Sequence, residues 1–105
     1  MTTQPPRLTP DQRKAALAKA QQARRVRAEQ KELLKTGSVG LRELFRRADE
    51  NDLIAGMKID SVLSSLPGVG KVRAKRALES HGIAENRRIR GLGARQRESL
   101  LREFS

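Results

Sequence analysis

The large apolar residues of this chain are gathered almost entirely in its last two thirds. Of its 24 Leu, Ile, Val and Phe residues, only five precede residue 38. A chain of 105 residues buries one small hydrophobic core. That core must therefore form within residues 38–105, and the segment before it has little to bury. The apolar residues of the later part recur at helical spacing, so we predict an all-α domain there.

The segment before the core is predicted to be one long helix over residues 9–36. Thr9-Pro10-Asp11-Gln12 supplies an N-cap, a proline at the first helical position, a carboxylate for the dipole and the glutamine of a capping box. Strong helix formers follow to Lys35, and Gly37 is a suitable stop. The helix would be about 40 Å long at ~1.5 Å per residue, and its first half should project from the domain. Residues 1–8 are polar and contain two prolines, so we predict that they are disordered.

Positive charge lies at both ends of the chain and is absent between them. The net charge is +11, with nine basic and three acidic residues in 1–35, four and five in 36–60, and ten and four in 61–105. Such a field attracts polyanions. On the long helix, one stripe could follow a nucleic-acid backbone or could be an ordinary solvated face, which is the more common case. Its members are Arg13, Arg24, Arg27, Lys31 and Lys35.

Several function classes are excluded or disfavoured by residue content. The chain has no cysteine and a single histidine, which leaves no thiolate or histidine cluster for a metal. We therefore expect no cofactor. No apolar run is long enough for a membrane span or a secretory signal, so a cytoplasmic protein is expected. Asp49, Glu50 and Asp52 form the acidic cluster, which a polar helix end explains better than acid–base catalysis.

The expected core elements come in order after residue 37. Ser38 is predicted to cap a helix whose stripe Leu41, Leu44, Phe45 and Ala48 faces the core. We expect Asp52 to cap the next turn, and Asp60 or Ser61 to cap a short helix that ends near Leu66. Phe104, in a last helix over residues 94–104, is also expected in the core.

A first hairpin turn follows that short helix. Pro67 ends it, and Gly68 and Gly70 let the backbone reverse without side chains in the way. The next helix then starts with free N–H groups and a positive dipole end, where a phosphate could bind. Basic residues follow at once: Lys71, Arg73, Lys75 and Arg76. The alternative is that the glycines only make the turn.

A second turn repeats this pattern. The helix after the first turn should bury Val72, Ala74, Ala77 and Leu78 and end at Gly82. Gly91 and Gly93 then flank Leu92 directly before the last helix. Arginines precede and follow this turn: Arg87, Arg88, Arg90, Arg95 and Arg97. Two such turns in one small domain favour phosphate binding over a flexible basic loop.

The chain resembles the actinobacterial integration host factor family from about Leu8 to Phe104. The resemblance rests on Gly56-Met57-Lys58, on LPGVGKVRAK at 66–75 and on RRIRGLG at 87–93. It implies a helix-two-turns-helix domain, residues 38–105, preceded by the long helix. It also implies a nucleoid-associated protein that binds double-stranded DNA with little sequence preference, bends or compacts it, and assists site-specific recombination. The first seven residues and the arginines at 46, 47 and 76 depart from the family pattern.

The expected DNA contacts come from both turns. The first turn contributes Ser64, Ser65, Leu66, Pro67, Gly68, Val69, Gly70, Lys71 and Arg73. The second contributes Gly82, Asn86, Arg87, Arg88, Ile89, Arg90, Gly91, Leu92, Gly93, Ala94 and Arg95. Base reading should be weak, because Trp and Tyr are absent and only Asn86 and Gln96 near the turns suit adenine edges.

The resemblance also leads to expectations about partners, and two alternative functions are weighed against it. We expect a monomer when free, more than one copy on DNA, a location in the nucleoid, and a site-specific recombinase or topoisomerase as a possible protein partner. A structured-RNA or ribosome-associated protein is the main alternative, since it could use the same basic turns. A glycosylase-like enzyme is disfavoured, because no second catalytic domain or base-flipping aromatic is present and the chain begins Met1-Thr2.

Overall fold

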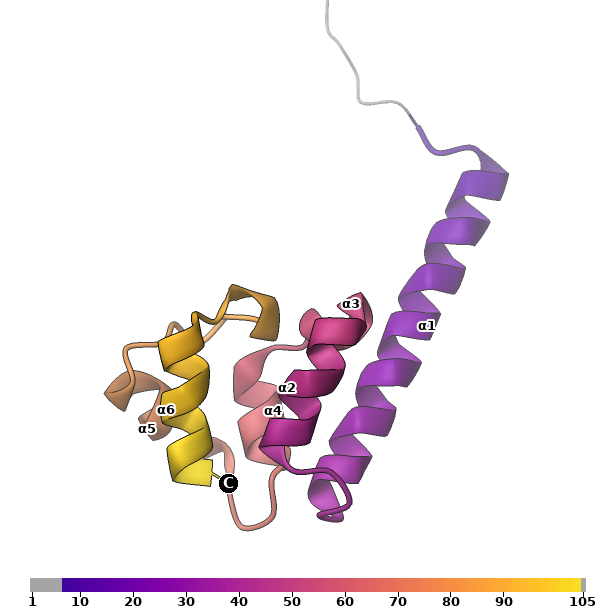
Figure 1. Ribbon diagram of the computed structural model, residues 1–105. Helices are drawn as coiled ribbons and strands as arrows, with labels where there is room; N and C mark the ends of the chain where they lie inside the picture. The colour runs from indigo at the N-terminus through magenta and orange to yellow at the C-terminus, as the bar shows by residue number, and fades with distance from the viewer. Residues whose placement is uncertain (1–6, 105) are drawn as a thin grey trace, which may run out of the picture.

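The computed structural model describes residues 7–104, and the regular elements of that range are helices. In chain order they are α1 (Pro10–Lys35), α2 (Leu41–Glu50), α3 (Asp52–Ala55), α4 (Ile59–Ser65), α5 (Lys71–Ser80), the 3-10 turn η1 (Ile89–Gly91) and α6 (Ala94–Phe104). Figure 1 shows α2, α4, α5 and α6 gathered into one body, with α1 leading away from it. The all-α prediction is confirmed.

The start and end of α1 follow from the predicted signals. The Gln12 amide donates to Thr9 Oγ1 over 3.1 Å, and the Thr9 amide donates to Gln12 Oε1 over 2.9 Å, so the capping box is present. The helix ends at Lys35 with Thr36 as its C-cap, and Gly37 follows with φ of +77°. Six of the eight residues predicted to be disordered, 1–6, lie outside the described residues.

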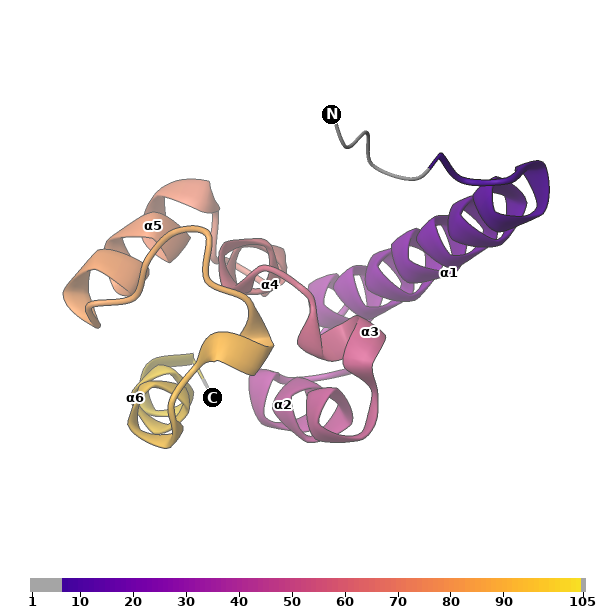
Figure 2. The same ribbon diagram turned by 90° about the horizontal axis from the view of Figure 1, so that it is seen from above.

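Only the second half of α1 packs against the body. Leu34 is fully buried, and the buried Gln30 accepts a 3.1 Å hydrogen bond from Arg47 Nη1 of α2. Leu17, in the first half, is 55% exposed. Figure 2 shows this half extending beyond the body, as predicted. The Cα radius of gyration is 16.5 Å, above the roughly 13 Å of a compact chain of about 100 residues.

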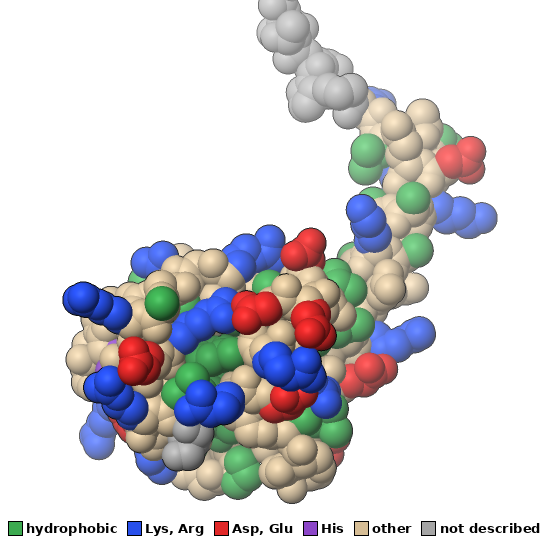
Figure 3. Space-filling model, in the orientation of Figure 1, with side chains coloured by type: hydrophobic (Ala, Val, Ile, Leu, Met, Phe, Trp, Pro, Cys, Tyr) green, Lys and Arg blue, Asp and Glu red, His purple; other side chains and the backbone are tan. Residues whose placement is uncertain are grey.

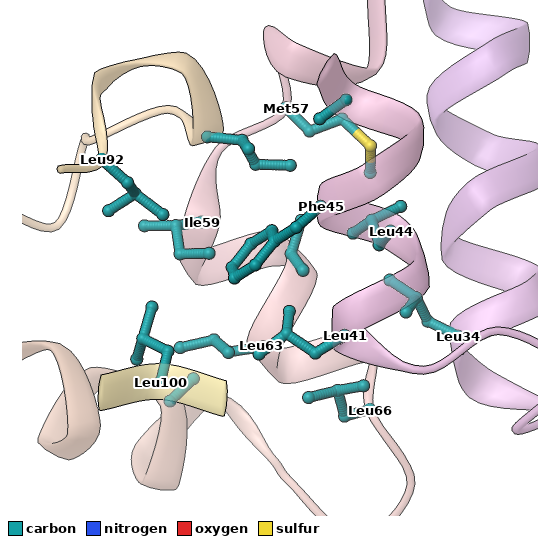
Figure 4. Packing of buried hydrophobic residues seen from close by; sticks show 14 of the residues in the cluster. Leu34, Leu41, Leu44, Phe45, Met57, Ile59, Leu63, Leu66, Leu92 and Leu100 are labelled. Atoms are coloured by element: carbon teal, nitrogen blue, oxygen red, sulfur yellow. The ribbon is translucent and has the colours of Figure 1, made fainter. Parts of the chain in front are cut away.

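The core fills the space between α2, α4, α5, α6 and the second turn. Leu41, Leu44, Phe45 and Ala48 are all buried, which confirms the predicted stripe of α2. Figure 4 shows Phe45 pointing toward Ile59 and Leu63 of α4, with Leu100 of α6 below. Phe104 is only partly buried and packs at the edge of this core. The core therefore fixes where α4 ends and α5 and α6 begin.

Three predicted helix caps are wrong. The N-cap of α2 is Gly40, without a side-chain cap, and the Ser38 hydroxyl instead lies 2.8 Å from the Thr36 hydroxyl. The N-cap of α3 is Asn51, whose Oδ1 accepts from the Leu53 amide over 2.9 Å; Asp52 is already helical. Each true cap lies one or two residues from the predicted one because packing of Leu41 and Ile54 sets the helix starts.

The third wrong cap is at α4, and one inward residue of α5 is also wrong. The helix α4 begins directly after Lys58, and Asp60 Oδ1 accepts from the Ser61 amide inside its first turn. In α5, Ala74, Ala77 and Leu78 are buried as predicted, but Val72 is 68% exposed. Val72 lies in the uncapped first turn of α5, on the side away from the core that Ala74 faces.

The described residues contain no helix long and apolar enough to cross a membrane. Over the same residues, no group of three or more His, Cys, Asp or Glu side chains is placed to hold a metal ion.

Candidate nucleic-acid interface

The first turn, residues 66–70, is held by apolar anchors. Leu66 and Val69 are 8% and 5% exposed, and the Val69 amide donates to the Leu66 carbonyl over 3.0 Å. Gly68 between them has φ of +75°, a conformation that favours glycine. Pro67, Gly68 and Gly70 are exposed. The turn thus presents backbone outward while its apolar side chains fix it to the core.

The start of α5 has no cap of its own. Gly70 is the N-cap and supplies no side chain, so the amides of Lys71, Val72 and Arg73 have no partner among the described residues. An added Cβ at Gly68 or Gly70 would meet nothing within 4 Å. The positive end of the α5 dipole therefore faces open space, which is the usual geometry for binding an anion.

The second turn runs from Gly82 to the start of α6. Gly82, with φ of +66°, ends α5 after the C-cap His81, whose Nε2 lies 2.9 Å from Glu103 Oε1. Ile83, Ile89 and Leu92 are buried and fix the turn to the core. The Gly93 amide donates to Gln96 Oε1 over 3.0 Å, so this oxygen of Gln96 is engaged at the start of α6.

The arginines of the second turn donate to backbone carbonyls. Arg88 Nη1 donates to the Gly56 carbonyl, and Arg90 Nη2 donates to the Asp52 carbonyl over 3.2 Å. Arg87 Nη1 donates to the Gly91 carbonyl over 3.3 Å. A carbonyl holds a guanidinium in place without neutralising its charge. These three side chains are therefore oriented, and none of them pairs with a carboxylate among the described residues.

Ion pairs of the described residues lie elsewhere, mainly on α2 and α6. Arg46 pairs with Glu43 at 2.6 Å and with Glu50 at 3.2 Å, and Arg97 of α6 pairs with Asp49 at 2.9 Å. The hydrogen bond from Arg46 lowers the pKa of Glu43 from 4.5 to about 2, with a further contribution from Arg47. Figure 3 shows this face, where red and blue side chains alternate over α2 and α6. The basic residues of the two turns, in contrast, form no ion pair among the described residues.

Two backbone hydrogen bonds tie the second turn to the start of α4. The Ile59 amide donates to the Arg87 carbonyl over 2.9 Å, and the Ile89 amide donates to the Met57 carbonyl over 3.0 Å. They make an isolated antiparallel bridge between Lys58 and Arg88. This pairing joins residues thirty positions apart and was not predicted from the sequence.

The predicted contact residues differ in how much of each side chain is exposed. The side chains of Ser65, Leu66, Val69, Ile89 and Leu92 are buried, so they offer a ligand only backbone atoms. The guanidinium of Arg73 lies 5.3 Å from the ring centre of Phe104, a cation–π contact beside the turn. Ser64 is half-buried and donates to the Ser61 carbonyl. Exposed positions are Pro67, Gly68, Gly70, Lys71, Arg73, Gly82, Asn86, Arg87, Arg88, Arg90, Gly91, Gly93, Ala94 and Arg95.

Gly56 and Lys58 belong to a family motif but were not predicted as contact residues, yet both lie at this site. Gly56 accepts the hydrogen bond from Arg88, and Lys58 is paired in the bridge. The motif Gly56-Met57-Lys58 was the feature of the sequence that could have indicated their place at the site.

Comparison with known proteins decides the family. The family model described as S13-like H2TH domain matches residues 34–104. The chain is 57% identical over 99 residues to the integration host factor of Streptomyces coelicolor, covering 94% of this chain and 92% of the relative. The chain belongs to the actinobacterial integration host factor family.

Further relatives agree with this assignment. The integration host factor of Mycobacterium tuberculosis is 46% identical over 99 residues, with 94% of each chain covered. A solved structure described as sIHF bound to an 8bp palindromic DNA superposes with a TM-score of 0.81 at 53% identity, covering 84% of this chain and 99% of that chain. Integration host factors are not enzymes, so the glycosylase alternative is set aside.

Proposed function

We propose that this integration host factor binds double-stranded DNA through backbone phosphates, with the two turns as its phosphate sites. The observation that carries the proposal is the pair of turns itself. At the first, α5 begins with unpartnered amides beside Lys71; at the second, Arg87, Arg88 and Arg90 stay un-neutralised and fixed in place. The solved relative described as bound to an 8bp palindromic DNA supports the same ligand.

Little sequence preference is part of the proposal. The groups that face outward at the turns are backbone amides and guanidinium or ammonium groups, which suit phosphates on any sequence. Gln96, one of two candidate adenine readers, is engaged with the Gly93 amide. Contacts at two turns could bend or bridge a duplex, so compaction of the nucleoid and assistance to a site-specific recombinase or topoisomerase are the cellular roles we infer. They would place a free monomer in the cytoplasm and copies of it on the chromosome.

The test is fluorescence anisotropy of two unrelated DNA duplexes and one RNA duplex of equal length, titrated with protein across a salt series. If about six phosphates are contacted, log affinity falls with log salt at a slope of about −5. Similar affinity for both DNAs, a slope of this size and weaker RNA binding would support the proposal.

A ribosome-type role is the second candidate, because the matching domain is described as S13-like. Preference for the RNA duplex in the same titration would favour it, since A-form grooves differ in width and carry the 2′-hydroxyl. A preference for one DNA by orders of magnitude would contradict the non-specific role.

A further inference from the structure

A cationic cleft lies where α1 meets the segment between α3 and α4. Figure 2 shows α3 and the start of α4 between α1 and η1, so that the second turn approaches α1 from the far side. The cleft has a volume of about 160 Å³. Its lining combines four basic side chains with no acidic one: Arg27, Lys31, Gly56, Met57, Lys58, Ser61 and Arg88.

Arg27 enters this cleft with an unsatisfied group. Its Nε is buried and has no hydrogen-bond partner among the described residues. A Cβ built on Gly56 would lie 3.2 Å from Arg27 Nη2 and 2.6 Å from Arg90 Nη2. Together with Arg88, which donates to the Gly56 carbonyl, three guanidinium groups converge on this one residue. The φ of Gly56 is −80°, so a side chain is absent here for space and not for backbone conformation.

This arrangement of positive charges is unfavourable in the protein without a bound anion. Like charges at close range repel, and a buried N–H without an acceptor costs free energy. Neither Lys31 nor Lys58 has an ion-pair partner among the described residues. An oxyanion in the cleft would neutralise part of the charge and supply the missing acceptor. Guanidinium groups suit a phosphate in particular, because their N–H groups match two of its oxygens.

We infer that this cleft is a third phosphate site, in which Arg27 and Lys31 of α1 act together with Lys58 and Arg88. The phosphate comes either from the backbone of a duplex bound at the second turn or from a free phosphate compound. The first source rests on the proposed function; the second does not. With the first, α1 is part of the DNA interface, and its docking against α3 and α4 serves binding as well as folding.

The direct test observes Arg27 itself. Inorganic phosphate is titrated into the full chain at constant ionic strength, with chloride as the balancing anion, and the Arg27 Nε–H resonance is followed by NMR. A saturable shift is expected. Arg27→Met keeps much of the side-chain volume and removes the charge, and it should abolish the phosphate response of the neighbouring Gly56 amide. Arg25→Met is the matched control, since Arg25 is exposed and lies about 160° around the helix at ~100° per residue.

Stability separates a binding site from a packing role. Without phosphate, Arg27→Met should raise the melting temperature, because an unpaired cation and a buried unsatisfied N–H are removed. Added phosphate should raise the melting temperature of the wild type by more than that of the variant, in which only the two turns are left to bind phosphate. A side chain that only packs would give the opposite result, a lower melting temperature and an unchanged phosphate response, and would overturn the inference.

A DNA-binding measurement distinguishes the two sources of the phosphate. If a backbone phosphate fills the cleft, Arg27→Met lowers the salt slope of DNA binding by about 1, and Arg25→Met leaves it unchanged. If the slope is unchanged while free phosphate still shifts Arg27, the source is a free phosphate compound. An Arg27 Nε–H resonance that neither phosphate nor duplex moves would overturn the inference. Failure of the wild type to bind DNA would instead contradict the proposed function and leave the phosphate titration to decide the cleft.

Discussion

The Ile89 amide donates a 3.0 Å hydrogen bond to the Met57 carbonyl, and both side chains are buried, at 0% and 1% exposure. This contact joins the second turn to the segment that starts α4. Because α4 ends at the first turn, one short helix sets the positions of both turns that we propose as phosphate sites. The arginines on either side of Ile89 owe their orientation to the core beneath it.

Loss of the Ile89 side chain should therefore affect folding and binding together. Ile89→Ala removes a fully buried side chain, which typically costs about 2–5 kcal/mol of unfolding free energy. DNA affinity should also fall, since Arg88 and Arg90 lose their support. Urea unfolding and anisotropy measure the two effects. Leu17→Ala, at an exposed position, should change stability by about 0.5 kcal/mol or less.

Local signals in the sequence predicted most of the helices. These signals depend on residues that lie within one or two helical turns of each other. They are the capping box at Thr9, the stripe of α2 and the glycines that end α1 and α5. The wrong caps at Ser38 and Asp52 show the limit of such signals. Several polar residues near a helix start are all chemically able to cap it, and tertiary packing selects among them.

The sequence predicted the two turns of the candidate site but not the long-range contacts around them. The glycines and arginines of both turns identified the candidate surface. The hydrogen bonds from Arg88 to Gly56 and from Arg90 to Asp52 join residues 32 and 38 positions apart, and no periodicity encodes such pairs. For the same reason, the meeting of Arg27 with the second turn was not foreseen. The position of Arg27 depends on how α1 packs against the body, and that packing is determined by the buried core residues.

The second-turn arginines should carry general DNA affinity. Changing Arg87, Arg88 and Arg90 together to Ala should weaken binding to unrelated duplexes alike and reduce the salt slope by up to about 3. The control removes the same charge from the α2–α6 face, with Arg42, Arg46 and Arg102 changed to Ala. Arg46 and Arg102 are ion-paired there. Equal loss in both variants would show that net charge alone, and not the turn, determines affinity.

A new cap at α5 should separate stability from binding. Gly70→Asp places a carboxylate where it can accept hydrogen bonds from the free amides at the start of α5 and interact favourably with the positive end of the helix dipole. This change should stabilise the fold by about 0.5 kcal/mol. The same carboxylate would occupy the proposed phosphate site, so DNA affinity should fall. Thermal unfolding and anisotropy give the two readings.

The chain offers a matched control for this change. Gly40 is the N-cap of α2, also lacks a side-chain cap, and has nothing within 4 Å of an added Cβ. Gly40→Asp should give a similar gain in stability and the same change in net charge, with DNA affinity nearly unchanged. If Gly70→Asp binds DNA as Gly40→Asp does, the start of α5 is not a phosphate site.

Glu43 should make folding stability sensitive to acid. Its pKa in the folded chain is lowered to about 2 by the hydrogen bond from Arg46, against an ordinary value of 4.5. The carboxylate therefore contributes stability above pH 4.5 and loses that contribution as the pH falls toward 2. Urea unfolding across this range should show a smaller decrease for Glu43→Gln than for the wild type. Arg46→Met should flatten the same part of the profile, because it removes the main partner; a wild-type profile in either variant would contradict this account.

Gly56→Ala tests the convergence of guanidinium groups with the smallest possible change. The added Cβ would meet the ends of two flexible side chains, Arg90 at 2.6 Å and Arg27 at 3.2 Å, and the Asp52 carbonyl at an ordinary 3.4 Å. Since the backbone of Gly56 has an ordinary φ of −80°, the fold should survive while both guanidinium groups move aside. We expect DNA affinity to fall several-fold, about 1 kcal/mol, as charge-assisted contacts are misplaced. Gly40→Ala, at a site with open space, is the control. Wild-type affinity in Gly56→Ala, with the arginine resonances shifted, would mean that the placement of Arg27 and Arg90 around this glycine does not contribute to DNA binding.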